Sequence, residues 1–478
     1  MPRGWSSLRA LWAVALGALA LQPGHAHAQA AAPCCTVAGR PLELTATAFG
    51  TASTAATLPF WLTANRYGLT GETAGAGLHL AATLPDQATG HFGTTVGGAL
   101  VGRAAAESAS TTHLHEGYVR VRYGPATVSA GLWRQVAGRH DEHLSAGSTT
   151  WSANAPPLPR VSLAVAPVDL PLTAGWLRLS GTLAHGWLTE DRFITEAQLH
   201  EKSAYLDVGR PSAAVQGYAG LIHHVIWGGV HPTQGAMPTR WFDVVTGANK
   251  GDHRNGNGVA MWDVGITVRR SSLGLTLYRQ FYQEDSTFDY QRNWKDGLWG
   301  LRLHGLQRPW LTALLYEYVD LLWQGARTEQ GEQRGADNYY NHAFYLDGWT
   351  YQGQVLGSPL ARTDRAFRGV VNNIVVAHHL GAMGELAPAW RYRLLLTYSR
   401  NYGAAGLLRS DAQSVADRVP GRTARRDQGA ALLEVTGPLA PQAGLYLQAG
   451  LGLNSGAAYA DGLGLLLGVQ WRSESGSR

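Results

Sequence analysis

The sequence predicts an all-β protein: a transmembrane, antiparallel β-barrel of the outer membrane with about 18 strands and long extracellular loops. Three observations support this prediction. Apolar and polar residues alternate over segments of about ten residues, the length of a tilted membrane strand. Charged residues make up only 15% of the chain, which holds 59 glycines, 17 tryptophans and 19 tyrosines. No apolar run of about 18 residues follows the N-terminal region, so membrane-spanning helices are not expected.

The N-terminal region has the pattern of a secretory signal peptide. Arg3 and Arg9 precede an apolar run at residues 11–21, and the small-x-small sequence AHA follows at residues 26–28. A short apolar run with these flanks is typical of an export signal. We therefore expect a signal peptide at residues 1–28 and the barrel at residues 29–478.

Cysteine count and net charge exclude several classes of protein. Cys34 and Cys35 are the only cysteines and are adjacent, so neither a disulfide framework nor a zinc-thiolate site is expected. The formal charge of +5 is too small to indicate nucleic-acid binding.

Strand assignment rests on strict alternation. Leu273, Leu275 and Leu277 fall on one face of a strand, while glycine, threonine and tyrosine fall on the other. A secreted β-sandwich would also alternate. Leucine-rich faces opposite nearly uncharged polar faces, and a last strand containing Trp471, favour a membrane barrel instead. In chain order the candidate strands are Leu42–Phe49, Gly75–Leu84, His91–Gly102, His113–Tyr123, Ala126–Trp133, Leu177–Leu188, Ser203–Gly209, Ala219–Trp227, Trp262–Arg269, Leu273–Phe281, Gly297–Leu306, Trp310–Asp320, Val370–Leu380, Arg393–Tyr402, Ala443–Asn454 and residues 462–471.

Short turns alternate with long polar connections, which barrels of this kind place outside the cell. The prolines at 167 and 171 predict that Val161–Leu177 is an extended segment that crosses the barrel or folds inward. The long connections are Glu107–Thr112, Arg139–Pro159, Thr233–Gly258, Gln324–Pro359 and Leu407–Asp427.

A polar and aromatic segment within residues 293–360 is the candidate ligand site. Aromatic rings could stack on sugar rings, while amide, imidazole and carboxylate groups bond the hydroxyls. The alternative is that this segment folds into the barrel and braces it. The candidate residues are Asp337, Tyr339, Tyr340, Asn341, His342, Trp349 and Tyr351, together with Asn338.

Alternation also places cations in the lumen. Arg302 and His304 share one face, as do Arg120 and Arg122. They could form a positive track for an acidic polysaccharide, which Asp296 and Asp337 would weaken. Arg302 and Asp296 are both candidate ligand-binding residues. Alternatively the cations knit the lumen together by pairing with carboxylates, for which Asp296, Glu317 and Asp337 are the candidates.

No metal, cofactor or catalytic site is expected. Residues 139–143 (RHDEH) hold two imidazoles and two carboxylates, but no second cluster completes a recognised metal site. Asp141/His143 and Asp337/His342 could form catalytic pairs on a barrel wall, yet a chain with 18 histidines offers such pairs by chance. No G-x-S-x-G sequence is present.

Several blocks in a fixed order resemble the Wzi family of capsule assembly proteins. The resemblance runs from about Pro59 to Leu360 and more loosely beyond. It implies an 18-stranded outer-membrane barrel with a lectin-like, non-catalytic role in holding polysaccharide at the cell surface. The blocks are PFWLTANRYG at 59–68, LAHGWL at 183–188, LHEK at 199–202, HVIWGG at 224–229, NWKDGLWG at 293–300, DNYYNH at 337–342 and GSPL at 357–360.

We therefore expect an outer-membrane protein that binds capsular or extracellular polysaccharide and contacts outer-membrane lipid, and that acts as a monomer without nucleic acid. A porin or transporter of the same architecture is one alternative, with the Asp337–His342 region as its constriction. A carbohydrate-active enzyme is a second alternative.

Overall fold

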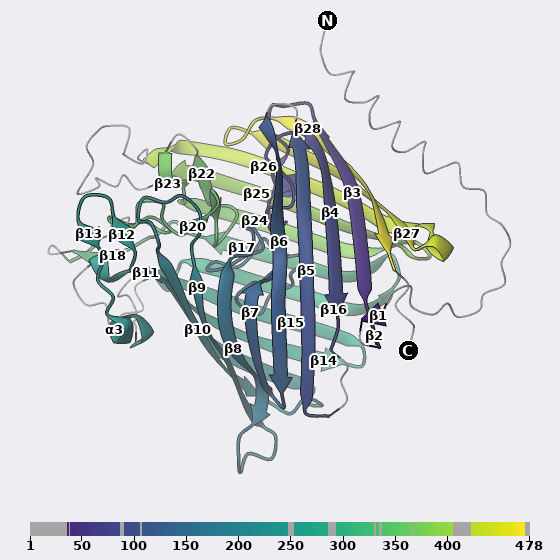
Figure 1. Ribbon diagram of the computed structural model, residues 1–478, viewed down its shortest axis with the longest axis horizontal. Helices are drawn as coiled ribbons and strands as arrows, with labels where there is room; N and C mark the ends of the chain where they lie inside the picture. Colours follow the sequence, from purple (N-terminus) through teal and green to yellow (C-terminus); the bar gives the residue numbers. More distant parts are fainter. Residues whose placement is uncertain are drawn as a thin grey trace, which may run out of the picture.

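The computed structural model describes residues 36–37, 39–86, 90–105, 108–246, 253–284, 293–328, 331–333, 337–364, 367–404 and 422–473. In this part of the chain, 18 antiparallel strands close into one barrel (Figure 1). The expected signal peptide lies outside the described residues. None of the described helices is long and apolar enough to cross a membrane.

The barrel closes where the last strand pairs with the first, Trp471 lying opposite Ala46. Closure pairs the backbone groups of both edges, which lipid could not hydrate. The barrel strands are β3 (Glu43–Ser53), β4 (Gly75–Leu84), β5 (Phe92–Ala105), β6 (Ser108–Tyr123), β7 (Ala126–Leu132), β8 (Pro159–Asp169), β9 (Leu177–Trp187), β10 (Gln198–Val208), β11 (Val215–Trp227), β14 (Asn257–Arg270), β15 (Leu273–Glu284), β16 (Gly297–Arg308), β17 (Leu311–Asp320), β24 (Val375–Ala387), β25 (Trp390–Gly403), β26 (Arg422–Ala440), β27 (Leu445–Gly456) and β28 (Gly462–Arg472).

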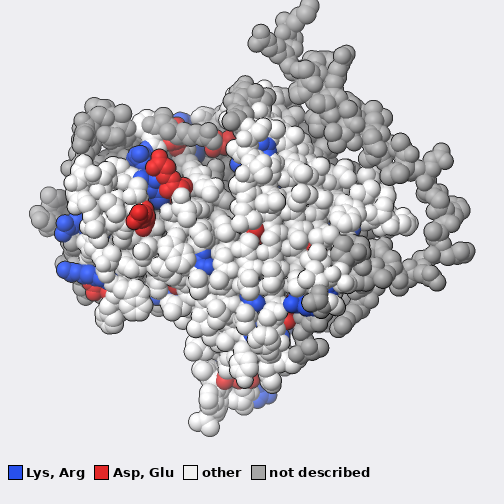
Figure 2. Space-filling view, viewed as in Figure 1, with Lys and Arg blue, Asp and Glu red and all other residues white. Residues whose placement is uncertain are grey.

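The predicted faces of the strands are confirmed. Leu273, Leu275 and Leu277 are 39–44% exposed on the outside of β15, whereas Tyr278 and Tyr282 point inward and are buried. On the face shown in Figure 2, the surface over the strands carries few charged side chains. An apolar, nearly uncharged belt is what lipid contact requires.

Exposed aromatic residues gather near both ends of the barrel. One belt contains Phe92, Tyr123, Trp176 and Trp310, and the other contains Trp187, Trp262, Trp299, Tyr316 and Tyr398. Amphipathic rings at two heights are typical of the two membrane–water interfaces.

The two ends differ in their connections. Turns such as residues 124–125, 271–272 and 309–310 join the strands at one end of the barrel. The first barrel strand, β3, begins at this end, and the last, β28, finishes there. Connections such as residues 133–158 and 321–374 join them at the other. The short-turn end faces the periplasm and the long-loop end faces the exterior.

Three strands correct the sequence interpretation. Val161–Leu177 does not cross the barrel, because most of it is β8 and the turn after it; Pro167 lies at a register shift between Val165 and Val168, where no ladder N–H is needed. Strand β26 was not predicted. The supposed loop Glu107–Thr112 is also wrong, since residues from 108 onward belong to β6.

Small elements lie on the long-loop side, where Figure 1 shows β12, β13, β18, β20, β22, β23 and α3 together. They are α2 (Phe60–Thr63), α3 (Trp241–Thr246), β12 (Val230–His231), β13 (Gly235–Ala236), β18 (Ala326–Thr328), β19 (Gly331–Gln333), β20 (Thr350–Tyr351), β21 (Gln354–Val355), β22 (Arg362–Asp364) and β23 (Phe367–Asn372).

Candidate functional site

Connections from the long-loop end fold into the lumen and fill its outer half. They are residues 54–74, 133–158 and 337–361, which we call the plug. Apolar side chains from all of them join one buried cluster with inward residues of the strands. Trp61 of α2 is 1% exposed and donates from Nε1 to Thr397 Oγ1 of β25 at 2.9 Å. Arg139–Pro159, expected as an outer loop, is therefore largely inside the barrel.

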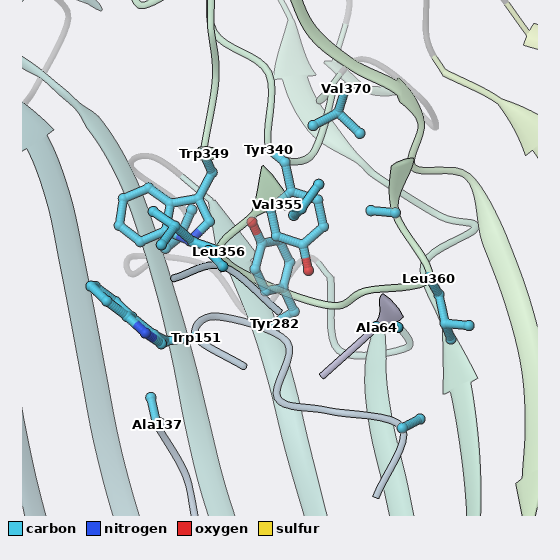
Figure 3. Packing of buried hydrophobic residues seen from close by; sticks show 14 of the residues in the cluster. Ala64, Ala137, Trp151, Tyr282, Tyr340, Trp349, Val355, Leu356, Leu360 and Val370 are labelled. Carbon is cyan, nitrogen blue, oxygen red and sulfur yellow. The ribbon is translucent and has the colours of Figure 1, made fainter. Parts of the chain in front are cut away.

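The predicted tyrosines lie at the centre of this cluster, and Figure 3 shows Tyr340 beside Tyr282 of β15. Ring centroids of Tyr282 lie 4.6 Å from Tyr339 and 5.2 Å from Tyr340. The Tyr340 backbone N–H donates to Glu284 Oε1 at 3.0 Å, and its hydroxyl donates to the Thr149 carbonyl at 2.5 Å. Tyr340 thus joins two plug segments to the wall.

Trp349 joins the same two plug segments, and Tyr351 joins the plug to the connection between β9 and β10. Trp349 donates from Nε1 to the Thr150 carbonyl at 2.7 Å, and its ring meets that of Trp151 at 6.5 Å in an edge-on arrangement (Figure 3). The Tyr351 hydroxyl bonds Thr189 Oγ1 at 2.9 Å.

Burial decides what these rings can do in this arrangement. Tyr339, Tyr340 and Trp349 are 0% exposed and Tyr351 is 1% exposed. Stacking on a sugar needs an open ring face, which none of the four has. The geometry favours the bracing alternative, and contact between these residues and a polysaccharide stays a prediction.

The polar members of the predicted set also bond within the plug. Asn341 clamps its segment to β23, donating to the Val370 carbonyl at 2.8 Å and accepting from the Val370 N–H at 2.7 Å. His342 Nδ1 accepts from the Tyr345 N–H at 3.2 Å. Asp337 caps its own turn by accepting from the Asn338 N–H at 3.0 Å.

Asp296 organises the connection before β16. Its carboxylate accepts from the N–H groups of Trp323 and Gln324 at 3.0 and 2.8 Å and from the Tyr339 hydroxyl at 2.6 Å. Burial raises the pKa of Asp296 to about 6, while these hydrogen bonds act in the opposite direction. Asp296 is therefore a structural acceptor in this conformation.

Arg302 lies in the lumen, as predicted, but its partner was not among the expected carboxylates. It pairs with Asp141 of the plug at 2.7 Å. Glu317, one of the expected partners, instead accepts from Ser145 Oγ and the Ala146 N–H at 2.7 and 2.6 Å. Lumen charges thus bind the plug in place.

The predicted cation track is also interrupted. Arg122 pairs with Asp86 at 2.9 Å, and the Arg120 guanidinium lies 4.4 Å from the Tyr118 ring centroid. Because Arg122 and Arg302 both have carboxylate partners, little uncompensated positive charge remains along this path. Within the described chain, no group of three or more His, Cys, Asp or Glu side chains could hold a metal ion.

Beneath the plug, the lumen widens into a cavity of about 960 Å³, which we call the vestibule. Thr312 and Tyr392 in its wall lie close to the short turns, so the vestibule occupies the periplasmic half. Glu434 stands between two arginines, with Arg66 at 3.0 Å and Arg393 at 2.5 Å. The sequence interpretation missed this triad, although alternation does place Arg393 on the inward face opposite Leu394.

A second charged group lies on the outer side of the plug, and we call it the cap cluster: Glu190, Arg192, Phe193, Asp347 and Arg368. Arg368 pairs with Asp347 at 3.0 Å and lies 5.6 Å from the Phe193 ring centroid. Asp347 also accepts from the Phe193 N–H at 2.7 Å, and Arg192 pairs with Glu190. Figure 2 shows side chains of both charges together over the region of β20 and β23.

The cap cluster was not predicted, because its members come from two connections with no shared motif, one between β9 and β10 and one between β17 and β24. Arg368 is 46% exposed at its side chain, which distinguishes it from the buried tyrosines. The cap cluster is thus a surface on which a large external ligand could act.

Comparison with known proteins gives one family. Residues 65–383 match the family described as capsule assembly protein Wzi. No curated protein matches the chain.

Several solved structures match the chain over most of its length. One is described as Wzi, an outer membrane protein involved in group 1 capsule assembly in Escherichia coli and a carbohydrate-binding β-barrel; it has a TM-score of 0.56 and 13% identity, with 89% of this chain and 83% of that chain covered. Pseudomonas aeruginosa OccD3 (OpdP) has a TM-score of 0.46 and 10% identity, with 93% of each chain covered. P. aeruginosa OprD has a TM-score of 0.45 and 11% identity, with 90% and 94% covered.

Proposed function

Because the chain belongs to the Wzi family of capsule assembly proteins, we propose that it binds capsular or other extracellular polysaccharide and holds it at the cell surface. It is a β-barrel of the outer membrane. The similar E. coli structure is described as carbohydrate-binding.

The plug is the observation that carries the proposal. A general diffusion pore needs a water-filled path, whereas inward-folded segments fill the outer half of this lumen with buried rings and ion pairs. A barrel closed in this way presents a folded surface to the exterior. Such a surface suits binding better than passage.

We place the polysaccharide contact at the cap cluster. Arg368 offers several N–H donors to carboxylates or hydroxyls of a polymer, and the Phe193 ring beside it offers an apolar surface. The buried set from Asp337 to Tyr351 supports this surface from beneath. The polysaccharide is the partner we propose, with no nucleic acid and no second subunit.

We further propose that the protein is not an enzyme. The candidate pair at Asp141 is engaged, since this carboxylate binds Arg302 and accepts from the His143 and Leu144 N–H groups at 2.9 Å. His342 Nδ1 is occupied by backbone donors. A general base needs a free lone pair aimed at its substrate.

The proposal is tested by measuring cell-bound and shed polysaccharide. Deleting the gene should increase the shed fraction, and the wild-type gene should restore retention. A gene that carries Arg368→Ala should restore several-fold less cell-bound polysaccharide than the wild-type gene. Arg425→Ala is the matched control, because Arg425 also forms an exposed ion pair, with Asp427 at 2.6 Å.

The two parts of the proposal fail separately. Unchanged retention after gene deletion would overturn the function. Full restoration by a correctly inserted Arg368→Ala variant would overturn only the placement at the cap cluster. Exposed pairs contribute about 0–1 kcal/mol, so neither arginine variant should impair folding.

A further inference from the structure

Helix α3 lies outside the barrel wall. Val244 of α3 packs against Val225 and Trp227 of β11 in a small buried cluster separate from the main one. Lys202 of β10 donates from Nζ to the Val245 carbonyl, and its Nζ lies 3.4 Å from the Val244 carbonyl oxygen. Figure 1 shows α3 beside β10 and β11 at their outer ends.

Strand register gives the height of this contact. Lys202 of β10 lies opposite His223 of β11. Leu221, two residues before His223 in β11, lies opposite Trp262 of β14. At the outer end of β10, Gln198 lies opposite Trp187. Trp187 and Trp262 belong to the outer aromatic belt, so α3 sits at the level of that belt.

The wall beneath α3 is polar at this height. His185 and His200 lie opposite each other on the outward faces of β9 and β10, next to Lys202 and His223. The His185 ring is flanked by Trp187 and Trp227, with centroids 5.2 and 5.9 Å away. Imidazole and ammonium groups are costly in hydrocarbon, so this height corresponds to the headgroup region.

The outer side of α3 presents large rings and a cation. Trp241 is 55% exposed and Phe242 is 72% exposed, while the Arg240 side chain is 71% exposed and lies 3.9 Å from the Asp243 carboxylate. Adjacent aromatic residues beside an arginine suit the membrane interface, where rings meet acyl chains and cations meet phosphates.

We propose that residues 239–246 form a lateral anchor that lies in the headgroup region of the outer leaflet. Trp241 and Phe242 contact lipid, and Arg240 faces the phosphate level. The anchor is continuous with the outer aromatic belt and fixes the rotation and depth of the barrel beside the wall formed by β9, β10 and β11.

Spin-label accessibility tests the anchor. A variant with Cys34→Ser and Cys35→Ser lacks both native cysteines. In this background Phe242→Cys is spin-labelled and reconstituted in vesicles of phosphatidylcholine and phosphatidylglycerol. Collision with oxygen, which partitions into lipid, is compared with collision with a water-soluble nickel complex.

Two reference positions calibrate the measurement. Leu275→Cys reports the lipid belt, since Leu275 is 43% exposed there, and Leu172→Cys reports water, since Leu172 is fully exposed at a periplasmic turn. The oxygen-to-nickel ratio at Phe242 should be several-fold above that at Leu172. A ratio equal to that at Leu172 would refute the anchor.

A second position guards against a disturbed helix. Trp241→Cys, labelled in the same way, should also exceed the Leu172 ratio. Dipolar broadening between labels at high dilution in lipid would mean that a second copy of the chain covers α3, and it would also overturn the lipid assignment.

Discussion

Asp296 shows at the residue scale how one buried carboxylate shapes a connection. It precedes β16 in the chain and accepts N–H groups from residues that follow β17. Its residue type and its polar neighbours suggested ligand binding in the sequence. In the structure its acceptor capacity is used by the backbone and by Tyr339.

The pKa of Asp296 predicts a pH dependence. Because its folded-state pKa of about 6 lies above its ordinary value of 3.8, protonation favours the folded protein. Its stabilising contribution is complete below about pH 4 and is lost as the pH rises through about 6. The expected loss is about 3 kcal/mol of unfolding free energy.

Comparison with Asp296→Asn isolates this effect, because asparagine does not titrate. Thermal unfolding in detergent should show the variant gaining relative to wild type between pH 4 and pH 7. A stability difference that is constant over this range would contradict the raised pKa.

At the element scale, the turn before β20 depends on one glycine. Gly348 has φ +67°, and a Cβ there would lie 2.1 Å from the Tyr340 carbonyl oxygen. Gly353 has φ +76° in the turn between β20 and β21, but nothing lies within 4 Å of its Cβ position. An alanine at Gly353 would therefore meet backbone strain alone, whereas an alanine at Gly348 would meet the same strain and a lack of space for its Cβ.

Gly348→Ala should therefore destabilise the protein more than Gly353→Ala. The left-handed conformation costs alanine about 1 kcal/mol at either position, and displacement of the Tyr340 carbonyl adds about 2 kcal/mol at Gly348. Thermal midpoints in detergent measure both. Equal midpoints would mean that the turn relaxes freely and that the plug is less tightly packed than its burial indicates.

Two strands that contain proline, β8 and β26, were not predicted as strands. Pro167 lies at a bulge of β8 and Pro438 lies next to a register shift of β26. Both strands continue because a bulge residue needs no ladder hydrogen bond. A sequence pattern shows the proline but not the partner strand that tolerates it.

At the scale of the whole molecule, the lumen is filled at one end and hollow at the other. The plug occupies the exterior half, and the vestibule of about 960 Å³ occupies the periplasmic half. This asymmetry bears on the alternative that the barrel is a pore with its constriction at Asp337–His342.

Planar-bilayer recordings should show no steady large conductance for the wild-type barrel. Replacing residues 338–358 with a Gly/Ser linker of equal length should produce one, because the replaced segment supplies Tyr339, Tyr340 and Trp349 to the plug. A large conductance of the wild-type protein would instead favour the pore. If the linker variant also shows no large conductance, the remaining plug segments close the lumen without residues 338–358.

The sequence by itself determined the barrel and the direction of its strand faces. Alternating residues, with no apolar run of about 18 residues after the N-terminal region, leave one solution in lipid, because every backbone group must be paired within a closed sheet. Residues such as Leu275 and Tyr278 therefore took their predicted sides without reference to any partner.

Only the tertiary structure decided which side chains meet inside. Tyr340 bonds a carbonyl 191 residues away and Trp349 bonds one 199 residues away, while Arg302 pairs with Asp141 of another connection. Such partners depend on strand number, register and the paths of inward loops. Local pattern carries none of this information, so the roles of the tyrosines, the cap cluster and the position of α3 emerged only from the folded chain.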